Sequence, residues 1–250
     1  MAPRLQTIPV GDGVWRIASR RVNCYLVRDG SSLALVDSGL PAHWDGIAAA
    51  CREVGLAASA IDAVLLTHVH ADHAGTAERA RADSRADVRL HPEDAELGDG
   101  RTRRRNERGL IAYLWRPAAV ATLIELVRGG ALRMPPLTTW APVHDGEVLD
   151  VAGRPTVMHV PGHTRGSVAF VLPDRDVCFT GDALVTWDLL TDRRGPRLLA
   201  RGFTEDSAAA LASLDRLAGL ATTTLLPGHG EPWRGAMSDA VDRARSVGLA

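Results

Sequence analysis

The 250-residue chain contains no lysine, and all 29 of its basic residues are arginine. It therefore cannot form a Schiff base through a lysine amine, and it lacks the lysine of a phosphate-binding P-loop. Thirty acidic residues leave a net charge of -1, which argues against a nucleic-acid partner because phosphate binding needs a basic surface. Since no apolar run approaches the roughly 20 residues that span a bilayer, we expect no membrane partner either.

Cysteine is also scarce. The three cysteines have no CxxC spacing and each lies in an apolar stretch, at Cys24, Cys51 and Cys178. We interpret them as small, buried core residues of a reduced protein. The first residues lack the apolar core of a signal peptide, so a cytoplasmic location is the expectation. A chain of this length can bury a large core without disulfides.

Short apolar runs bounded by turn residues predict a chain rich in strands. We expect strands at residues 14–17, 22–27, 33–36, 61–66, 88–90, 148–151, 156–160, 168–172, 177–180 and 223–226. Apolar residues at helical spacing predict helices at 41–54, 75–82, 204–217 and 237–245. Each half runs from strands to helix, which fits two antiparallel-rich sheets packed together with helices on their outer faces.

Residues 92–141 interrupt this rhythm. Leucines at helical spacing lie on both sides of Pro117, and Gly129 and Gly130 end the pattern. We therefore expect one domain, residues 1–250, with a mainly helical insertion at about 92–141. This insertion either caps the active site or mediates oligomerisation. The oligomeric state stays open, with a homodimer as one option.

One short segment, residues 67–75, contains four candidate metal ligands: His68, His70, Asp72 and His73. At the extended end of a strand, His68 and His70 would point the same way because side chains repeat every two residues. Asp72 and His73 lie where the chain turns into the next helix. One loop could therefore provide two ligands to each of two metals. Imidazole and carboxylate groups suit zinc, iron or manganese.

Three further candidates share one setting, an apolar run followed by a glycine and then a ligand. They are His163, Asp182 and His229. The glycines allow a tight turn and a close approach of the backbone. Functional groups on loops at the ends of strands are the expected arrangement on a rigid sheet scaffold.

The motifs HxHxDH, GHT, GD and a late GHG, in this order, resemble those of the metallo-β-lactamase fold superfamily of binuclear metallohydrolases, in particular its glyoxalase-II-like members. The resemblance covers the chain from about Leu5 to the last helix, except 92–141. It implies an α/β (α+β) fold, a four-layer αββα sandwich of two mixed sheets with outer helices. It implies one metal held by His68, His70 and His163, and a second held by Asp72, His73 and His229. Asp182 would bridge the two metals together with a hydroxide, and Asp37 would brace the metal loop without touching a metal.

The reaction implied by this resemblance is hydrolysis. The hydroxide that bridges two divalent metals, zinc before iron or manganese, would attack the carbonyl of a small thioester, ester or lactone. The catalytic candidates are Asp182, which bridges the metals, and Asp72, which could carry a proton to the leaving group. Lactonases of the family have a tyrosine just beyond the bridging aspartate, but residues 183–187 contain none. Asp182 also stands where secreted zinc β-lactamases have a cysteine, which disfavours that activity.

Three other classes of function stay open. A mononuclear-iron persulfide dioxygenase uses part of the same ligand set, although His229 and a second metal argue against it. A nuclease of this fold would need a basic face, and only the arginines at 101–105 offer one. A non-catalytic metal-binding scaffold would be expected to have lost some of the ligands, yet all seven candidates are present.

The expected partner is a small-molecule substrate. Without lysine, any anionic substrate group must be held by arginine, and the candidates are Arg104, Arg105 and Arg165. An exposed, solvated helix face is the alternative interpretation of the arginine cluster at 101–108. The four histidines outside the motifs are expected to be structural or solvated, with His43 on the exposed side of a helix start.

Overall fold

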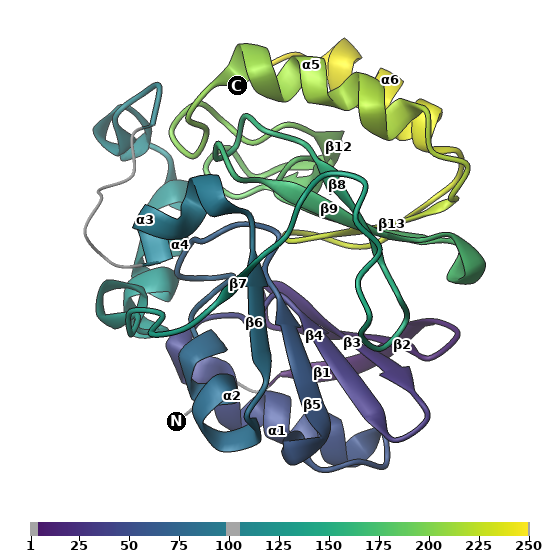
Figure 1. Ribbon diagram of the computed structural model, residues 1–250. Helices are drawn as coiled ribbons and strands as arrows, with labels where there is room; N and C mark the ends of the chain where they lie inside the picture. The colour runs from purple at the N-terminus through teal and green to yellow at the C-terminus, as the bar shows by residue number, and fades with distance from the viewer. Residues whose placement is uncertain (1–4, 99–105, 250) are drawn as a thin grey trace.

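Two mixed β-sheets pack face to face (Figure 1). The computed structural model describes residues 5–98 and 106–249. The first sheet has seven strands, in the order β1 (Gln6–Gly11), β2 (Val14–Ala18), β3 (Asn23–Asp29), β4 (Ser32–Val36), β5 (Ile61–Leu65), β6 (Asp87–Leu90) and β7 (Ala141–Pro142). The first four strands form an antiparallel meander, and β4 to β7 run parallel.

The second sheet has five strands and is also mixed. Its order is β14 (Trp233–Arg234), β13 (Thr224–Pro227), β10 (Val177–Gly181), β9 (Val168–Leu172) and β8 (Thr156–His159). Only the β10–β13 pair is parallel. A separate two-stranded ribbon consists of β11 (Val185–Asp188) and β12 (Arg193–Arg197). In the sequence, this ribbon comes directly after β10 of the second sheet.

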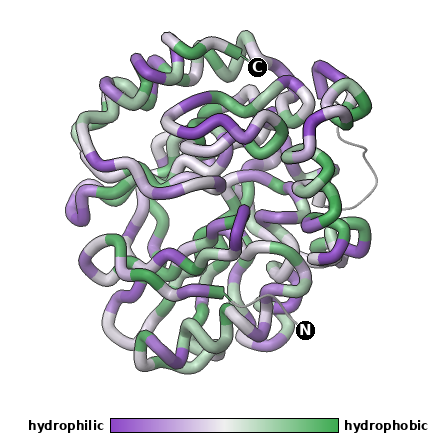
Figure 2. The backbone as a smooth tube through the Cα atoms, turned by 180° about the vertical axis from the view of Figure 1, so that it is seen from behind, coloured by the Kyte–Doolittle hydropathy of each residue, from purple (hydrophilic) through white to green (hydrophobic). Residues whose placement is uncertain are grey.

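Helices cover the outer faces of both sheets (Figure 1). The first sheet is covered by α1 (Trp44–Glu53) and α2 (Ala77–Ser84), and the second by α5 (Ser207–Ala218) and α6 (Met237–Val247). The helices α3 (Ala95–Gly98) and α4 (Pro117–Arg128) lie along one side of the sandwich. Figure 2 shows from behind that the two chain ends lie in opposite halves of the molecule. Two packed sheets with helices on both outer faces confirm the predicted αββα sandwich.

Apolar layers lie between the two sheets and between each sheet and its outer helices. The layer between the two sheets includes Phe170 and Phe179, whose strands β9 and β10 are buried along their whole length. Such strands have continuous apolar runs because both faces are covered. The Phe179 ring lies 5.1 Å from the Tyr25 ring of the first sheet. The Tyr25 hydroxyl also donates a 2.6 Å hydrogen bond to the Pro227 carbonyl, so the two sheets are linked by packing and by a buried polar contact.

Most predicted elements are present, with three corrections. The strand predicted at 148–151 is wrong, because only an isolated bridge joins Val148 to Thr156. The strand β1 and the β11–β12 ribbon were not predicted, since polar or charged residues interrupt their apolar pattern. The helix expected from residue 204 begins at Ser207. Asp206 caps it by accepting a hydrogen bond from the Ala209 amide.

The three cysteines are free and buried, as predicted. Burial raises the pKa of the Cys178 thiol to about 12, which keeps it protonated and inert. The predicted exposure of His43 is wrong, because only 3% of this residue is exposed. Its Nδ1 accepts a hydrogen bond from the Leu40 amide, and burial lowers its pKa to about 4. His43 is therefore a neutral, structural histidine.

The described residues between β6 and β7 are mainly helical. Tyr113 and Ala119 from this segment pack against Val185 and Trp187 of the β11–β12 ribbon. The segment thus lies beside the strand that follows Asp182, and its role as a cap stays a prediction. Arg104 and Arg105 lie outside the described residues. Within the described ranges, no helix is long and apolar enough to cross a bilayer.

We expect Phe179→Ala to lower the free energy of unfolding by about 3–5 kcal/mol, because it opens a cavity in the layer between the sheets. Urea denaturation would measure this change. Trp115→Ala is the matched control, since 73% of Trp115 is exposed and its loss should cost less than about 0.5 kcal/mol. Equal costs for both variants would contradict the assigned position of the core.

Candidate metal centre

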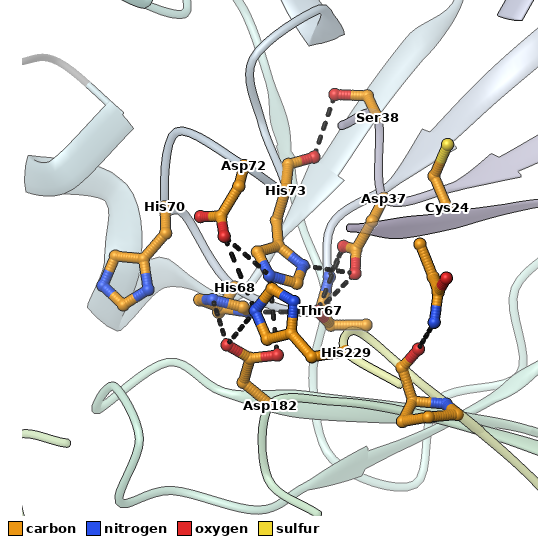
Figure 3. A network of polar contacts seen from close by, with 12 residues as sticks. Cys24, Asp37, Ser38, Thr67, His68, His70, Asp72, His73, Asp182 and His229 are labelled. Carbon is orange, nitrogen blue, oxygen red and sulfur yellow. Dashed lines mark hydrogen bonds and ion pairs between the residues drawn. The ribbon is translucent and has the colours of Figure 1, made fainter. Parts of the chain in front are cut away.

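Seven side chains from both sheets converge at one edge of the sandwich, and Figure 3 shows six of them, all except His163. The loop of residues 67–75 follows β5 of the first sheet, and Asp182 approaches from the second sheet on the opposite side. His163 follows β8 and His229 follows β13. The structure therefore brings together all seven candidates predicted from the sequence: His68, His70, Asp72, His73, His163, Asp182 and His229.

The first group of donors is made of three imidazoles. His163 Nε2 lies 3.1 Å from His68 Nε2 and 2.9 Å from His70 Nδ1. The predicted reason for the shared direction of His68 and His70 is wrong, because β5 ends at Leu65 and a bend follows. The two rings meet edge to face, with centroids 4.6 Å apart. The bent loop, and not strand periodicity, directs them to one point.

The second group contains Asp72, His73 and His229. Asp72 Oδ2 lies 3.9 Å from His73 Nε2 and 3.5 Å from His229 Nε2. Asp182 lies between the two groups. Its Oδ2 is 3.3 Å from His163 Nε2 and 3.2 Å from His229 Nε2, and its Oδ1 is 3.5 Å from His73 Nε2. This is the position that a bridging ligand would need.

Asp37 braces the loop as predicted from the resemblance, and it contacts two of the loop residues. Its Oδ1 accepts a 2.8 Å hydrogen bond from the Thr67 amide, and the Thr67 hydroxyl donates to the same carboxylate. Its Oδ2 lies 2.8 Å from His73 Nδ1. Because a carboxylate only accepts, Nδ1 carries a proton, and Nε2 is the atom of the neutral ring that can bind a metal in the centre.

The His229 loop is held by groups that the sequence analysis missed. His229 Nδ1 donates a 2.6 Å hydrogen bond to the Arg21 carbonyl, so its Nε2 also faces the centre. The Asn23 side chain donates to the carbonyls of Pro227 and Gly230, at 2.9 and 2.7 Å. A buried asparagine in an otherwise apolar strand is a signal that could have revealed this role.

Asp94, also missed, joins the two loops that carry the first group of donors. Its Oδ2 accepts hydrogen bonds of 2.9 Å from the Val69 amide and from the Thr164 hydroxyl. Its Oδ1 accepts a 2.8 Å hydrogen bond from the Gly166 amide. Burial raises the pKa of Asp94, whose exposed fraction is only 1%. In the sequence, Asp94 follows Pro92 and cannot be told from an ordinary acidic residue in a helical first turn.

One glycine lets the His229 loop come this close. A Cβ on Gly228 would overlap Asp182 Oδ1 and would lie 2.5 Å from His73 Cε1. No other residue can stand at this position without moving two of the donors. The sequence predicted a glycine that allows close approach before this histidine, and the overlap explains why a larger residue does not fit there.

The electrostatics of the centre favour positive charge. Burial opposes the charged form of Asp182, but His229, His73 and His163 outweigh it and hold the pKa of this carboxyl well below its ordinary value. Burial likewise disfavours a charged His73, yet Asp182 and Asp37 raise its pKa well above the ordinary value. Protons on the imidazoles or bound cations would both satisfy this demand.

The residues fit bound divalent transition metals. Each of three groups, His68–His70–His163, His68–His73–Asp182 and Asp72–His73–His229, has its ligand atoms within 4.8 Å of one another. His73 Nε2 and Asp182 Oδ1 are buried and have no hydrogen-bond partner among the described residues. Buried polar atoms without a partner are costly, and metal coordination removes that cost. Imidazole and carboxylate are also the donors that zinc and iron accept.

The comparison with known proteins agrees with this geometry. A family model described as the Metallo-beta-lactamase superfamily matches residues 19–229. The chain belongs to this superfamily. Members of the metallo-beta-lactamase superfamily bind divalent metals, and the matched range contains all seven donor residues.

Three proteins that are similar to this chain illustrate the relationship. Protein ML0493 of Mycobacterium leprae is 35% identical over 83% of this chain and 86% of its own length. The acyl-coenzyme A thioesterase MBLAC2 of Homo sapiens is 27% identical over 72% of this chain and 67% of its own. The solved structure of TTHA1623 in a di-iron-bound form has a TM-score of 0.62 and 30% identity, and covers 88% of this chain and 92% of that one.

Of the three arginines predicted to hold an anionic group, only Arg165 lies among the described residues. Its side chain is exposed and lines a cavity of about 450 Å³ beside Pro161 and Gly162. Three acidic residues line the same cavity, so its surroundings do not favour an anion. Arg104 and Arg105 stay predictions.

We expect Asp94→Asn to weaken Zn²⁺ binding by about 10- to 100-fold, because an amide replaces one of the two accepting oxygens and the two loops separate. Competition with a chelating dye would measure the affinity. Asp83→Asn, a change of an exposed residue on α2, is the matched control. Unchanged Zn²⁺ affinity in a folded Asp94→Asn variant would show that Asp94 does not position the donors.

Proposed function

We propose that the protein is a metal-dependent hydrolase that cleaves small thioesters, with esters and lactones as related substrates. The observation that carries the proposal is the position of Asp182 between two groups of three donors. An arrangement of this kind is used by hydrolases that act on carbonyl substrates with two metals.

We assign His68, His70 and His163 to one divalent metal, and Asp72, His73 and His229 to a second, with Asp182 shared between them. Divalent metals bound here would lower the pKa of a coordinated water toward about 7 and polarise a substrate carbonyl. Asp37 and the Arg21 carbonyl keep the protons of His73 and His229 on Nδ1, away from the centre. These contacts fix the imidazoles in the orientation that binding requires.

Asp72 is the best candidate to move a proton. Its side chain is 15% exposed, whereas that of Asp182 is 4% exposed. Its carboxylate therefore stands between the buried centre and solvent. A proton taken up there could pass to the thiolate or alkoxide that leaves. Asp182 is enclosed by imidazoles and is suited to bridging instead.

Two findings favour a thioester over a lactone. One relative that covers most of this chain is named as an acyl-coenzyme A thioesterase. In addition, residues 183–187 contain no tyrosine, the residue expected beyond the bridging aspartate of a lactonase. The net charge of -1 gives no support to a nuclease.

We propose zinc as the metal, with iron as the second candidate. Zinc suits the imidazole and carboxylate donors. The di-iron form of a 30% identical relative is the observation that favours iron. A persulfide dioxygenase with a single iron would leave Asp72, His73 and His229 without a use, so we place it second among the functions.

Elemental analysis should find about two transition-metal ions per chain after expression with added metal. Asp182→Ala should lose metal and reduce kcat/KM for a thioester by more than about a hundredfold, because the shared ligand is gone. Asp174→Ala removes an exposed carboxylate and should change neither. Full activity in Asp182→Ala, or no bound metal in the unaltered protein, would overturn the proposal.

A substrate panel separates the candidate functions. Metal-loaded protein should hydrolyse short-chain thioesters faster than matched esters, lactones and β-lactams. Oxygen consumption with a glutathione persulfide, together with one iron per chain and no hydrolysis, would instead identify the dioxygenase.

A further inference from the structure

A second feature of the molecule is a cavity of about 590 Å³, which is lined in part by Arg21, the residue whose carbonyl holds His229. Its wall is made of the turn between β2 and β3, the segment that precedes α1, and one face of α4. We call it the arginine cavity, because Arg20, Arg21 and Arg128 line it. None of the seven donor residues lines it, so it is a separate space.

Two lining residues place the cavity beside the second group of donors. The carbonyl of Arg21 accepts the 2.6 Å hydrogen bond from His229 Nδ1. His43 lies near enough to Asp72 to interact with its charge. The cavity therefore lies on the Nδ1 side of His229, behind the second group of donors.

The wall of the cavity is firmly built. The Arg21 guanidinium is 5% exposed and donates to the Thr122 hydroxyl at 3.0 Å and to Glu125 at 2.6 Å. These contacts fasten α4 to the turn that supports His229. At the far end of α4, the Gly129 carbonyl accepts a 3.1 Å hydrogen bond from the Ala42 amide. Hydrogen bonds near both ends of α4 therefore hold this helix against the other two walls of the cavity.

The charges in the cavity are unequal. Glu125 pairs with Arg21, which leaves Arg20 and Arg128 exposed and without an ion pair to any described residue. A guanidinium group can donate paired hydrogen bonds to a phosphate or carboxylate. Leu40 and Ile124 add apolar contact surface. An anionic group with a short apolar stem matches this lining.

A different cavity, beside Pro161 and Gly162 in the His163 loop, has more acidic than basic residues in its lining. Glu93, Glu205 and Asp206 line it with Arg165. An extended substrate whose carbonyl lies at the metal centre would therefore meet an acidic wall beside His163 and a basic wall beside His229. This difference in charge would favour the orientation in which the anionic end of the substrate lies beside the basic wall.

We propose that the arginine cavity binds the anionic arm of the thioester, with Arg20 and Arg128 holding its phosphate or carboxylate. The assignment rests on the proposed function for the identity of the substrate, but the anion site itself does not. The phosphate would belong to the thiol carrier, and the carboxylate would belong to the acyl group.

Binding can be measured without turnover. S-methyl coenzyme A, a thioether that cannot be hydrolysed, should bind the metal-loaded protein in isothermal titration calorimetry. The double variant Arg20→Gln/Arg128→Gln should raise its Kd about tenfold. Arg243→Gln on α6 removes one exposed arginine on the far layer and should leave the Kd unchanged. S-methyl pantetheine, which has no phosphate, should bind weakly and equally to all three proteins.

Kinetics with two N-acetylcysteamine thioesters test the carboxylate source. If the arm is on the acyl group, the double variant should raise KM about tenfold for the succinyl thioester and leave the butyryl thioester unchanged. Dependence of either probe on the two arginines supports the proposal and identifies the source. Independence of both probes overturns it, even if neutral thioesters are hydrolysed. Arginine-dependent binding of S-methyl coenzyme A without any thioester hydrolysis would refute the proposed function and leave the anion site standing.

Discussion

The metal centre depends on keeping buried carboxylates and imidazoles together in a place where water cannot solvate them. Such groups separate or change protonation unless a rigid frame holds them. Here two further buried acids provide the frame. Asp37 binds Thr67 and His73 within one loop, and Asp94 joins that loop to the His163 loop. Each accepts hydrogen bonds as a carboxylate, the stronger kind of bond in a protein interior.

The same contacts connect the centre to the space around it. Arg21 contributes its carbonyl to His229 and its guanidinium to α4. The helix that borders the arginine cavity is therefore tied to the loop that carries a donor. Gly228 completes this arrangement, since any side chain there would displace Asp182 and His73. The proposed anion site and the donor set therefore share one residue, Arg21, whose contacts link α4 to the His229 loop.

The candidate donors could be predicted from the sequence because each lies in a short motif at a strand end, where chain connectivity alone sets the position. The groups that orient the donors could not be predicted so readily. Asp94 stands in an unremarkable helical turn, and Arg21 acts through a backbone carbonyl that any residue possesses. Predictions also failed where a local pattern competes with tertiary packing, as at Val148 and His43. Burial of a residue depends on distant segments that local periodicity does not report.

The sequence by itself determined the layered architecture, the buried cysteines and the set of seven donors, because hydrophobic periodicity and motif spacing are local properties of the chain. The resemblance to the superfamily implied how those donors divide into two groups around Asp182 and that Asp37 braces their loop, and only the tertiary structure revealed Asp94 as a second bracing acid. It also placed two arginines from distant segments, Arg20 and Arg128, in one cavity, where neither forms an ion pair with a described residue. The contacts of Arg21 with Thr122 and Glu125 join residues about a hundred positions apart. They arise from the packing of α4 against the turn between β2 and β3 of the first sheet, and no local pattern in the sequence predicts them.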